Sequence, residues 1–536
     1  MKRGTRLIIC LLFLSTCLKG QDQYMVFFTD KANTNYSTNR PLEFLSQRAI
    51  DRRLKHNAAI TSQDFPVNSS YVDQVGALGI ETYYTSRWMN ALLVQMEAVD
   101  VNNVMSLPFV ESVEFVSPAA ILSPPGEIEQ TDDSPLPPPR VETLQYQMLG
   151  IDQMHTEGYM GSDVFVAIFD SGFNNYDNNP AFAHILAENR FIHTFNYVDN
   201  SIDVGNRFDH GLNVLSVLGA DGEMIGAVPK ASFMLAVTEN EVSEYRIEEY
   251  NWLFAAEAAD SIGVDIINTS LGYSEFDDAS MDYTVSQMDG QTAVITRAAN
   301  IAASKGILLV NSSGNQRNSP WGTITAPADS ENVLAVGAIN SIGVLAGFSS
   351  SGLGGGGTTK PDVVALGVNV EVTNPQGFLT VANGTSFSSP LVAGLATGLI
   401  EAFPEKTNIQ LMDILRESGD RAKNPDDDYG FGIPLFERAV KIADESLIPI
   451  EEGIIAYPNP TDLPYFTLSF GEPFIGEEVG IEIYNSEGAK VEVYRIVPSL
   501  FNNKQEIDLS SIRPGLLVLR LTSSLGVITK KIIKRG

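Results

Sequence analysis

Cysteine is almost absent from this 536-residue sequence, and both examples, Cys10 and Cys17, lie within residues 1–20. Those residues begin with basic side chains, continue with an apolar run and end in small or polar residues, a pattern typical of a secretory signal peptide cleaved near Gly20. A lipoprotein signal ending at Cys17 is the alternative, and Thr16 disfavours it. Once residues 1–20 are removed, the chain has no cysteine, which excludes disulfides and a thiol nucleophile.

Long apolar runs and basic residues are also scarce. After the first twenty residues, no stretch reaches the ~20 apolar residues that a transmembrane helix needs. The chain has 35 Lys and Arg residues but 66 Asp and Glu residues, which gives a formal net charge of −31. A surface of that sign repels phosphate backbones, so nucleic-acid binding is disfavoured. Hydrophobic residues make up 44% of the chain and charged residues 19%, a composition that indicates globular domains rather than disorder.

Changes of pattern divide the rest of the chain into units. Residues 21–118 combine strand-like runs with an amphipathic helix at residues 40–57, which predicts a ferredoxin-like α+β module in the order β-α-β-β-α-β. Residues 119–143 are rich in proline and acidic side chains, which predicts an extended linker. Short alternating strands after Pro449 predict a small β-sandwich over residues 450–536.

The largest unit, residues 144–445, alternates apolar runs with helix-like stretches. VFVAIFD, VDIINTSL and ILLVNSSG are three of the runs. Strands that are apolar throughout and are separated by helices predict an α/β fold, a mostly parallel sheet with helices on both faces. Ligands bind such sheets at the carboxyl ends of the strands, so the residues just after each run are the candidates for function.

Four polar residues at such positions suit catalysis. Asp170 ends one run, Asn315 follows another, and His210, one of only five histidines, begins a helix-like stretch. Ser386 stands at the start of a further helix-like stretch, where free backbone N–H groups suit an oxyanion forming beside the serine. Each residue alone also has an ordinary explanation as a turn former or a helix cap. Together they indicate a serine-hydrolase site in which the Asn315 amide supplies a second oxyanion donor.

The order of these residues narrows the class of hydrolase. Asp, His and Ser follow one another along the chain, which is the order of subtilisin rather than of chymotrypsin or the α/β-hydrolases. The G-x-S-x-G elbow of the α/β-hydrolases is missing, because Ser388 stands where the second glycine belongs. A lipase or esterase is therefore disfavoured as an alternative function.

Five motifs occur in order along the chain: DSG at Asp170, HG at His210, NTSLG at 268–272, SGN ending at Asn315, and NGTSFSSPLVAG at 383–394. With these motifs the sequence resembles the subtilisin-like serine peptidases from residue 153 to residue 440. The resemblance implies a subtilisin-like fold and a secreted serine endopeptidase that hydrolyses peptide bonds through an acyl-enzyme intermediate.

The resemblance also implies the role of each residue. Ser386 would be the nucleophile, His210 the general base and Asp170 the residue that orients His210. Asn315 and the backbone N–H of Ser386 would form the oxyanion hole. Four further residues would bind substrate, three in an edge strand and one in the primary specificity pocket: Ser270, Leu271, Gly272 and Gly314.

Two departures keep alternatives open. The family usually has HGTHVAG at the histidine, whereas this chain reads HGLNVLS, with Leu212 and Asn213 in place of Thr and a second His. A catalytically dead subtilase fold that serves as a binding or adhesin module is therefore the alternative function. Calcium is the one cofactor that the family suggests, but no regular ligand spacing marks a site, and the acidic run at 426–428 is interpreted as a solvated loop. No metal ligand is predicted.

The flanking units resemble known parts as well. Residues 21–118 are similar to the inhibitory propeptide of this family, and the linker at 119–143 is where cleavage would activate the zymogen. Residues 450–536, with YPNP and a basic end, are similar to the sorting domains of type IX secretion, although Leu517 stands where an aromatic residue is frequent. An ordinary β-sandwich appendage is the alternative.

The resemblance therefore implies three partners and a location. The partners are polypeptide substrates, the chain's own propeptide as an inhibitor, and the secretion machinery through the C-terminal unit. The protein would be secreted or held at a bacterial cell surface.

Overall fold

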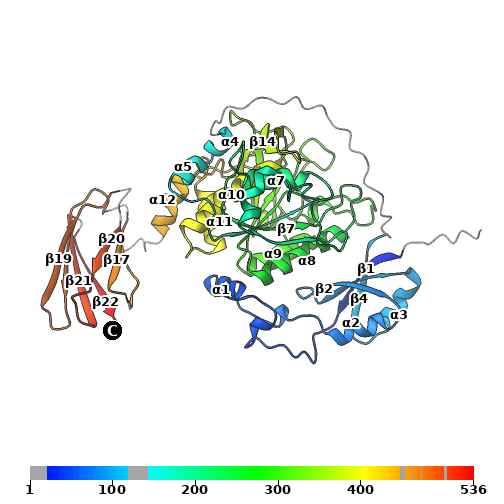
Figure 1. The fold of residues 1–536 in the computed structure, drawn as a ribbon, viewed down its shortest axis with the longest axis horizontal. Coiled ribbons are helices and arrows are strands. Elements are labelled where there is room, and N and C mark those ends of the chain that lie inside the picture. The colour runs from blue at the N-terminus through cyan, green and yellow to red at the C-terminus, as the bar shows by residue number, and fades with distance from the viewer. Residues whose placement is uncertain are drawn as a thin grey trace, which may run out of the picture.

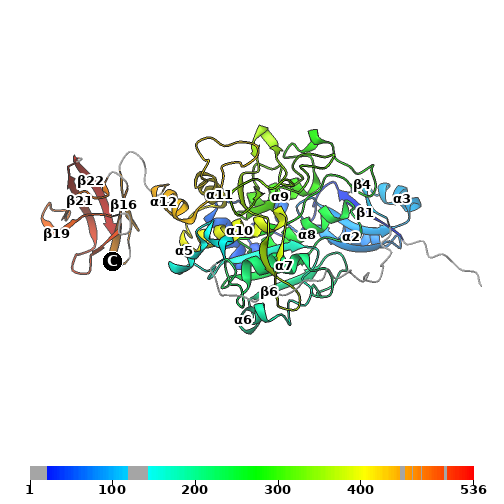
Figure 2. The same cartoon turned by 90° about the horizontal axis from the view of Figure 1, so that it is seen from above.

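The computed structural model describes residues 21–118, 143–446 and, with short gaps, 453–535. The predicted signal peptide and nearly all of the predicted linker lie outside the described residues. Figures 1 and 2 show the N-terminal sheet and the C-terminal strands on opposite sides of a large central unit. Within the described residues, no helix combines the length and the apolar character that a membrane crossing requires.

The N-terminal module is a four-stranded antiparallel sheet in the order β2-β3-β1-β4. Its elements are β1 (Asp22–Phe28), α1 (Gln47–Lys55), α2 (Ser69–Gly76), β2 (Glu81–Ser86), β3 (Ala91–Met96), α3 (Val101–Met105) and β4 (Val110–Ser117). The α+β prediction is confirmed, but one helix more than expected lies between β1 and β2. The helix predicted over 40–57 is shorter, because Ser46 caps its start by accepting the N–H of Ala49.

The central unit is built on a seven-stranded parallel sheet in the order β13-β10-β9-β8-β5-β7-β6. The strands are β5 (Phe165–Asp170), β6 (Phe191–Asn196), β7 (Ser232–Val237), β8 (Ile266–Thr269), β9 (Leu308–Ser312), β10 (Leu334–Ile339) and β13 (Val363–Leu366). This confirms the predicted α/β fold.

Helices cover both faces of this sheet, because successive side chains of a strand point to opposite faces. In β5, Val166 and Ile168 pack into one apolar core with α7 and α10, whereas Ala167 and Phe169 pack into another with α8 and α9. The helices are α4 (Leu144–Gln147), α5 (Ile151–Thr156), α6 (Ala183–Ala187), α7 (His210–Gly219), α8 (Ile247–Ile262), α9 (Val294–Ser304), α10 (Thr385–Ala402), α11 (Asn408–Glu417) and α12 (Phe436–Ser446). Short strands complete the unit: β11 (Gly352–Leu353), β12 (Thr359–Lys360), β14 (Val370–Thr373) and β15 (Leu379–Ala382).

The N-terminal module shares a core with the central unit. Met25, Trp88 and Leu93 belong to the same buried cluster as α8 and α9, whereas Tyr24 and Val26 face the module's own helices. Helix α1 lies apart from the sheet of its own module (Figure 1) and packs against α8 of the central unit.

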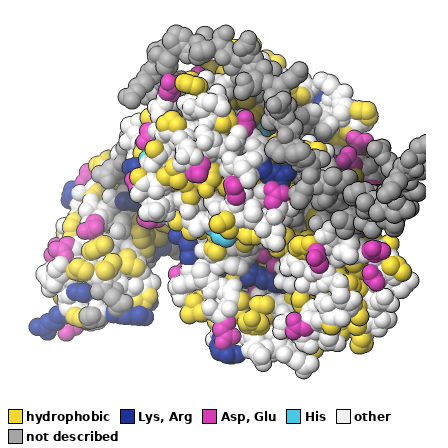
Figure 3. All heavy atoms as spheres, turned by 45° about the vertical axis from the view of Figure 1, so that its right-hand side comes forward, with side chains coloured by type: hydrophobic (Ala, Val, Ile, Leu, Met, Phe, Trp, Pro, Cys, Tyr) yellow, Lys and Arg dark blue, Asp and Glu magenta, His cyan; other side chains and the backbone are white. Residues whose placement is uncertain are grey.

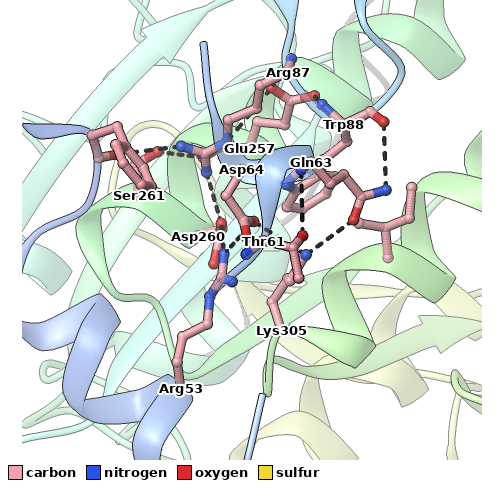
Figure 4. A network of polar contacts seen from close by, with 12 residues as sticks. Arg53, Thr61, Gln63, Asp64, Arg87, Trp88, Glu257, Asp260, Ser261 and Lys305 are labelled. Atoms are coloured by element: carbon pink, nitrogen blue, oxygen red, sulfur yellow. Dashed lines mark hydrogen bonds and ion pairs between the residues drawn. The ribbon is translucent and has the colours of Figure 1, made fainter. Parts of the chain in front are cut away.

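A network of buried charges joins the module to α8 and α9, as Figure 4 shows. Asp260 of α8 accepts from Arg52, Arg53 and Arg87 of the module at 2.5, 2.7 and 2.7 Å. Arg53 also pairs with Asp64 at 2.9 Å. Buried charges are tolerated only when they are paired in this way. The buried arginines of the module therefore need the Asp260 carboxylate of the central unit, and Asp260 needs them.

The C-terminal unit consists of two antiparallel sheets, β16-β17-β20 and β19-β18-β21-β22. Its strands are β16 (Ile454–Tyr457), β17 (Tyr465–Phe470), β18 (Val479–Tyr484), β19 (Lys490–Ile496), β20 (Lys504–Asp508), β21 (Gly515–Ser523) and β22 (Gly526–Lys534). Phe466, Leu468 and Phe470 alternate along β17 and pack against β18 and β21, where Leu517 is buried. The predicted β-sandwich pattern is therefore observed.

In the central unit and elsewhere, acidic side chains are scattered over the face seen in Figure 3.

Candidate active site

The predicted Asp and His meet at the carboxyl end of β5. Asp170 is the last residue of this strand and His210 is the first residue of α7. The Asp170 carboxylate can only accept, so Nδ1 of His210 donates to its Oδ1 at 2.7 Å, which leaves Nε2 as the ring nitrogen that can take a proton. Asp170 is 1% exposed and also accepts the backbone N–H of Ser171.

Two glycines allow this close approach. A Cβ on Gly211 would lie 2.5 Å from the carbonyl oxygen of Gly172 and 2.8 Å from Cβ of Asp170. A Cβ on Gly172 would lie 2.7 Å from the backbone nitrogen of Phe208. The DSG and HG motifs are therefore needed for the start of α7 to pack against the end of β5.

The surroundings of His210 favour its charged form. Burial by itself lowers the pKa of His210, but the charge and the hydrogen bond of Asp170 and the charge of Glu241 together raise it above its ordinary value. Glu241 also accepts from the Ser171 hydroxyl. The sequence reasoning missed Glu241, whose only signal is the acidic stretch that follows β7.

Ser386 lies in the first turn of α10 and is 9% exposed. Its hydroxyl donates to the carbonyl oxygen of Ser270 at 3.1 Å, and the Ser270 hydroxyl donates back to the carbonyl oxygen of Ser386 at 2.8 Å. The ring of Phe387 packs 5.5 Å from the His210 ring. The serine hydroxyl therefore faces Ser270 rather than His210 in this structure, an arrangement that agrees with the looser geometry of catalytic groups without substrate.

Asn315 is held by the start of α10. Its Oδ1 accepts both the backbone N–H and the hydroxyl of Thr385 at 3.0 Å. That pairing orients the amide so that Nδ2 lies on the side of Gly384, where a Cβ would be 3.6 Å away. A second donor is thus available beside the N–H groups of the α10 N-terminus.

The predicted substrate-binding residues lie together. Ser270, Leu271 and Gly272 follow β8, and Gly314 follows β9 with φ +100°. A cavity of about 110 Å³ is lined by Ser270, Leu271, Gly272, Ser312, Gly314, Asn315, Gln316, Thr325, Thr385 and Ser386. The sequence reasoning missed Thr325, because nothing in its local pattern marks it.

The altered histidine motif does not disturb the site. Leu212 is fully buried in the core beside α10, and Asn213 lies further along α7 with a buried Oδ1 that has no hydrogen-bond partner among the described residues. His210 keeps its Asp170 contact despite both changes.

Three carboxylates form a cluster of the kind that can hold a cation. Oxygens of Glu239, Glu244 and Glu248 lie within 4.8 Å of one another. Burial and neighbouring charges raise the pKa of Glu244 to about 7 and that of Glu239 well above its usual value. Tyr273 donates to Glu239, and Glu248 accepts the N–H groups of Asn240 and Tyr245, so two of the three carboxylates already have protein partners. The acidic run at 426–428 is exposed, as expected of a solvated loop.

Three families match the chain. They are described as Peptidase S8 propeptide domain, Bacteroidota, over residues 23–132; Subtilase family, over residues 161–432; and Secretion system C-terminal sorting domain, over residues 455–535. The sorting domain implies secretion or attachment at the cell surface.

Relatives and a solved structure agree with these matches. The chain is 31% identical over 269 residues to subtilisin of Bacillus pumilus, which covers 49% of this chain and 86% of that protein. It is also 31% identical over 269 residues to subtilisin E of Bacillus subtilis, covering 49% of this chain and 62% of that protein. The crystal structure of the epidermin leader peptide processing serine protease of Staphylococcus aureus has a TM-score of 0.52 at 16% identity, covering 78% of this chain and 99% of that one, which shows a shared fold. The chain therefore belongs to the subtilase family of serine peptidases, with an N-terminal propeptide domain and a C-terminal sorting domain of type IX secretion.

Proposed function

We propose that this enzyme is a secreted endopeptidase that cleaves polypeptides through Asp170, His210 and Ser386. The observation that carries the proposal is the 2.7 Å contact of His210 Nδ1 with Asp170 beside a serine in the first turn of a buried helix. The Ser386 hydroxyl alone is a weak nucleophile, so it must leave Ser270 and turn toward Nε2 of His210, which takes its proton. Asp170 holds the imidazole in the required tautomer and stabilises its positive charge.

The remaining steps follow from the positions of the donors. Attack of Ser386 Oγ on the substrate carbonyl forms a tetrahedral intermediate whose negative oxygen accepts from Nδ2 of Asn315 and the N–H of Ser386. His210 then gives its proton to the departing amine, and water hydrolyses the acyl-enzyme by the same route. An extended substrate would pair with the backbone of 270–272, as strand-adding peptides do, while Gly314 lines the pocket for one side chain.

Activity-based labelling tests this proposal. A fluorophosphonate probe should label the wild-type enzyme covalently at Ser386, and the Ser386→Ala and His210→Ala variants should stay unlabelled. Ser286→Ala removes an exposed hydroxyl of the same unit and is the matched control, so it should label normally. An unlabelled wild-type enzyme with a native fold would favour the alternative, a catalytically dead binding or adhesin module.

The flanking units support a proposal about maturation. The proposed units are the propeptide (21–118), the linker (119–143), the catalytic domain (144–445) and the sorting domain (450–536). The propeptide would inhibit the catalytic domain. The shared core and the buried charges between the module and α8 support tight binding of the module after cleavage. Self-cleavage is proposed within residues 117–143, nearly all of which lie outside the described residues.

The C-terminal unit is proposed to engage the secretion machinery. Deleting residues 450–536 should leave peptidase activity in cell extracts but stop export beyond the outer membrane, because the unit folds around its own core. Activity in the medium is compared between the full chain and the truncated chain. Normal release of the truncated enzyme would make this unit an ordinary appendage.

A further inference from the structure

We propose that Thr325 closes the floor of the cavity beside Ser386 and restricts cleavage to peptide bonds that follow a small residue, Ala, Ser or Thr. The inference rests on the proposed function. A substrate whose carbonyl lies against Ser386 and Asn315, and whose backbone pairs with 270–272, places the side chain of that same residue in this cavity.

The backbone fixes Thr325 against the substrate-binding strand. The next residue, Ala326, pairs with Tyr273 in both directions: the N–H of Tyr273 donates to Ala326 at 2.9 Å and the N–H of Ala326 donates back at 3.0 Å. Thr325 is only 2% exposed, so the floor is not open to solvent. The Thr325 backbone therefore cannot withdraw from a larger substrate residue without moving this paired segment.

The Thr325 hydroxyl lies between the two walls of the cavity. A Cβ built on Gly272 would lie 2.2 Å from Thr325 Oγ1, and a Cβ built on Gly314 would lie 3.0 Å from it. With Thr325 in this position, the cavity has a volume of about 110 Å³, and this volume includes the space beside Ser386 and Asn315. A cavity of about 150 Å³ is known to take a benzene ring. A substrate side chain that enters between Gly272 and Gly314 therefore meets the Thr325 hydroxyl, which leaves little depth for an aromatic ring.

The chemistry of the lining points the same way. Thr325 Oγ1 is buried and has no hydrogen-bond partner among the described residues, and an unpaired buried hydroxyl is costly. A hydroxyl can both donate and accept, so a serine or threonine of the substrate can satisfy it. The lining residues include no carboxylate that would pair with lysine or arginine. Small side chains, with or without a hydroxyl, are thus the ones that fit.

A substrate series tests the size limit. The mature wild-type enzyme is assayed with acyl-Ala-Ala-Pro-Xaa p-nitroanilides in which Xaa is Ala, Ser, Thr, Leu, Phe or Lys. We expect kcat/KM for Ala, Ser and Thr to exceed that for Leu, Phe and Lys by at least about 10-fold, because one surplus methylene in a tight pocket costs about 10- to 200-fold. Equal or faster cleavage after Phe or Leu would overturn the proposal.

Variants of Thr325 test whether this residue sets the size limit on the substrate side chain. Thr325→Gly should raise kcat/KM for Phe by about 10-fold or more, with a much smaller change for Ala. Thr325→Val keeps the shape without the hydroxyl, so it should keep Ala ahead of Phe but lower the rate for Ser relative to Ala. Thr323→Gly is the matched control, since Thr323 does not line the cavity, and its ratio of Phe to Ala should stay at the wild-type value. If the ratio of kcat/KM for Phe to that for Ala in Thr325→Gly equals the wild-type ratio, Thr325 does not set the size limit.

The two proposals fail in different ways. Titration of Ser386 with the fluorophosphonate counts the folded, active enzyme in every variant. A labelled enzyme that prefers Phe refutes only the size limit. An enzyme that is folded, unlabelled and inactive on every substrate refutes the proposed function and this inference with it.

Discussion

The contact of the N-terminal module with α8 and the cavity beside Ser386 both contain buried polar side chains, but the two regions differ in whether those side chains are paired. At the contact, Asp260 meets Arg52, Arg53 and Arg87, and each of these charges has an opposite charge within 2.7 Å. The cavity lining has no charged residue, and Thr325 Oγ1 has no partner among the described residues.

The difference separates binding within the chain from recognition of a substrate. A buried charge loses its hydration when the chain folds, so it needs a partner already built into the protein. A neutral hydroxyl loses less, so it can remain without a partner until a substrate supplies one. The module contact is therefore suited to strong, specific docking, and the cavity is suited to selecting among passing peptides.

Removing the proposed nucleophile, Ser386, is expected to have the largest effect. Ser386→Ala should lower kcat by about 10⁶-fold, a magnitude measured for subtilisin and transferred here through family membership. The variant should also accumulate with the module still attached, because cleavage needs the complete triad. Mass spectrometry of the purified variant checks both points when no other protease is present. A precursor cut at the same bond without Ser386 would mean that another enzyme does the cutting.

Breaking the charge network is expected to have the next largest effect. In the uncut Ser386→Ala precursor, Arg53→Met leaves Asp64 and Asp260 short of a partner, so urea denaturation should show a loss of about 3–5 kcal/mol. Arg40→Met is the control, since Arg40 forms an exposed pair with Glu43, and it should cost less than about 0.5 kcal/mol. Equal losses in both variants would remove the contrast between the two regions.

Removing the proposed oxyanion donor, Asn315, is expected to affect the chemical step. Asn315→Ala should lower kcat by about 10²- to 10³-fold with a much smaller change in KM, because the lost donor acts on the transition state. This magnitude is again that of subtilisin. Steady-state kinetics on one good substrate provide the measurement, and an unchanged kcat would exclude Asn315 from the oxyanion hole.

The smallest expected effect is a shift in pH dependence. His210 must be neutral to accept a proton, so kcat/KM should fall as the pH drops through its raised pKa, above the ordinary value of 6.5. Glu241→Gln removes a negative charge that raises this pKa, so the acid limb of the profile should move to lower pH. Glu157→Gln, an exposed change outside the site, is the control and should leave the profile in place. A shift toward higher pH would contradict the assigned effect of Glu241.

Residues whose role depends on a local pattern could be predicted from the sequence. Asp170 ends an apolar run and Asn315 follows another, which is where a parallel sheet binds ligands. His210 and Ser386 were selected because each begins a helix-like stretch. The structure brings the two pairs to one edge. Residues whose role depends on a distant partner could not be predicted, and Glu241 and Thr325 are the examples at the site.

The first helix of the module illustrates the same limit. Its amphipathic pattern predicted a helix over residues 40–57, but the Ser46 cap makes the helix begin only at Gln47. Its partner could not be predicted, because Asp260, which pairs with Arg52 and Arg53, lies 208 and 207 residues further along the chain.

The sequence by itself determined the family, the α/β class and the identity of the candidate catalytic residues, because each depends on motifs or periodicities within a few turns of chain. Tertiary structure alone decided the order of the strands, the docking of α1 on α8 and the closed floor at Thr325. The physical reason is that these features depend on which surfaces meet: Thr325 limits the cavity only because the pairing of Ala326 with Tyr273 brings it between Gly272 and Gly314, residues that lie far from one another along the chain.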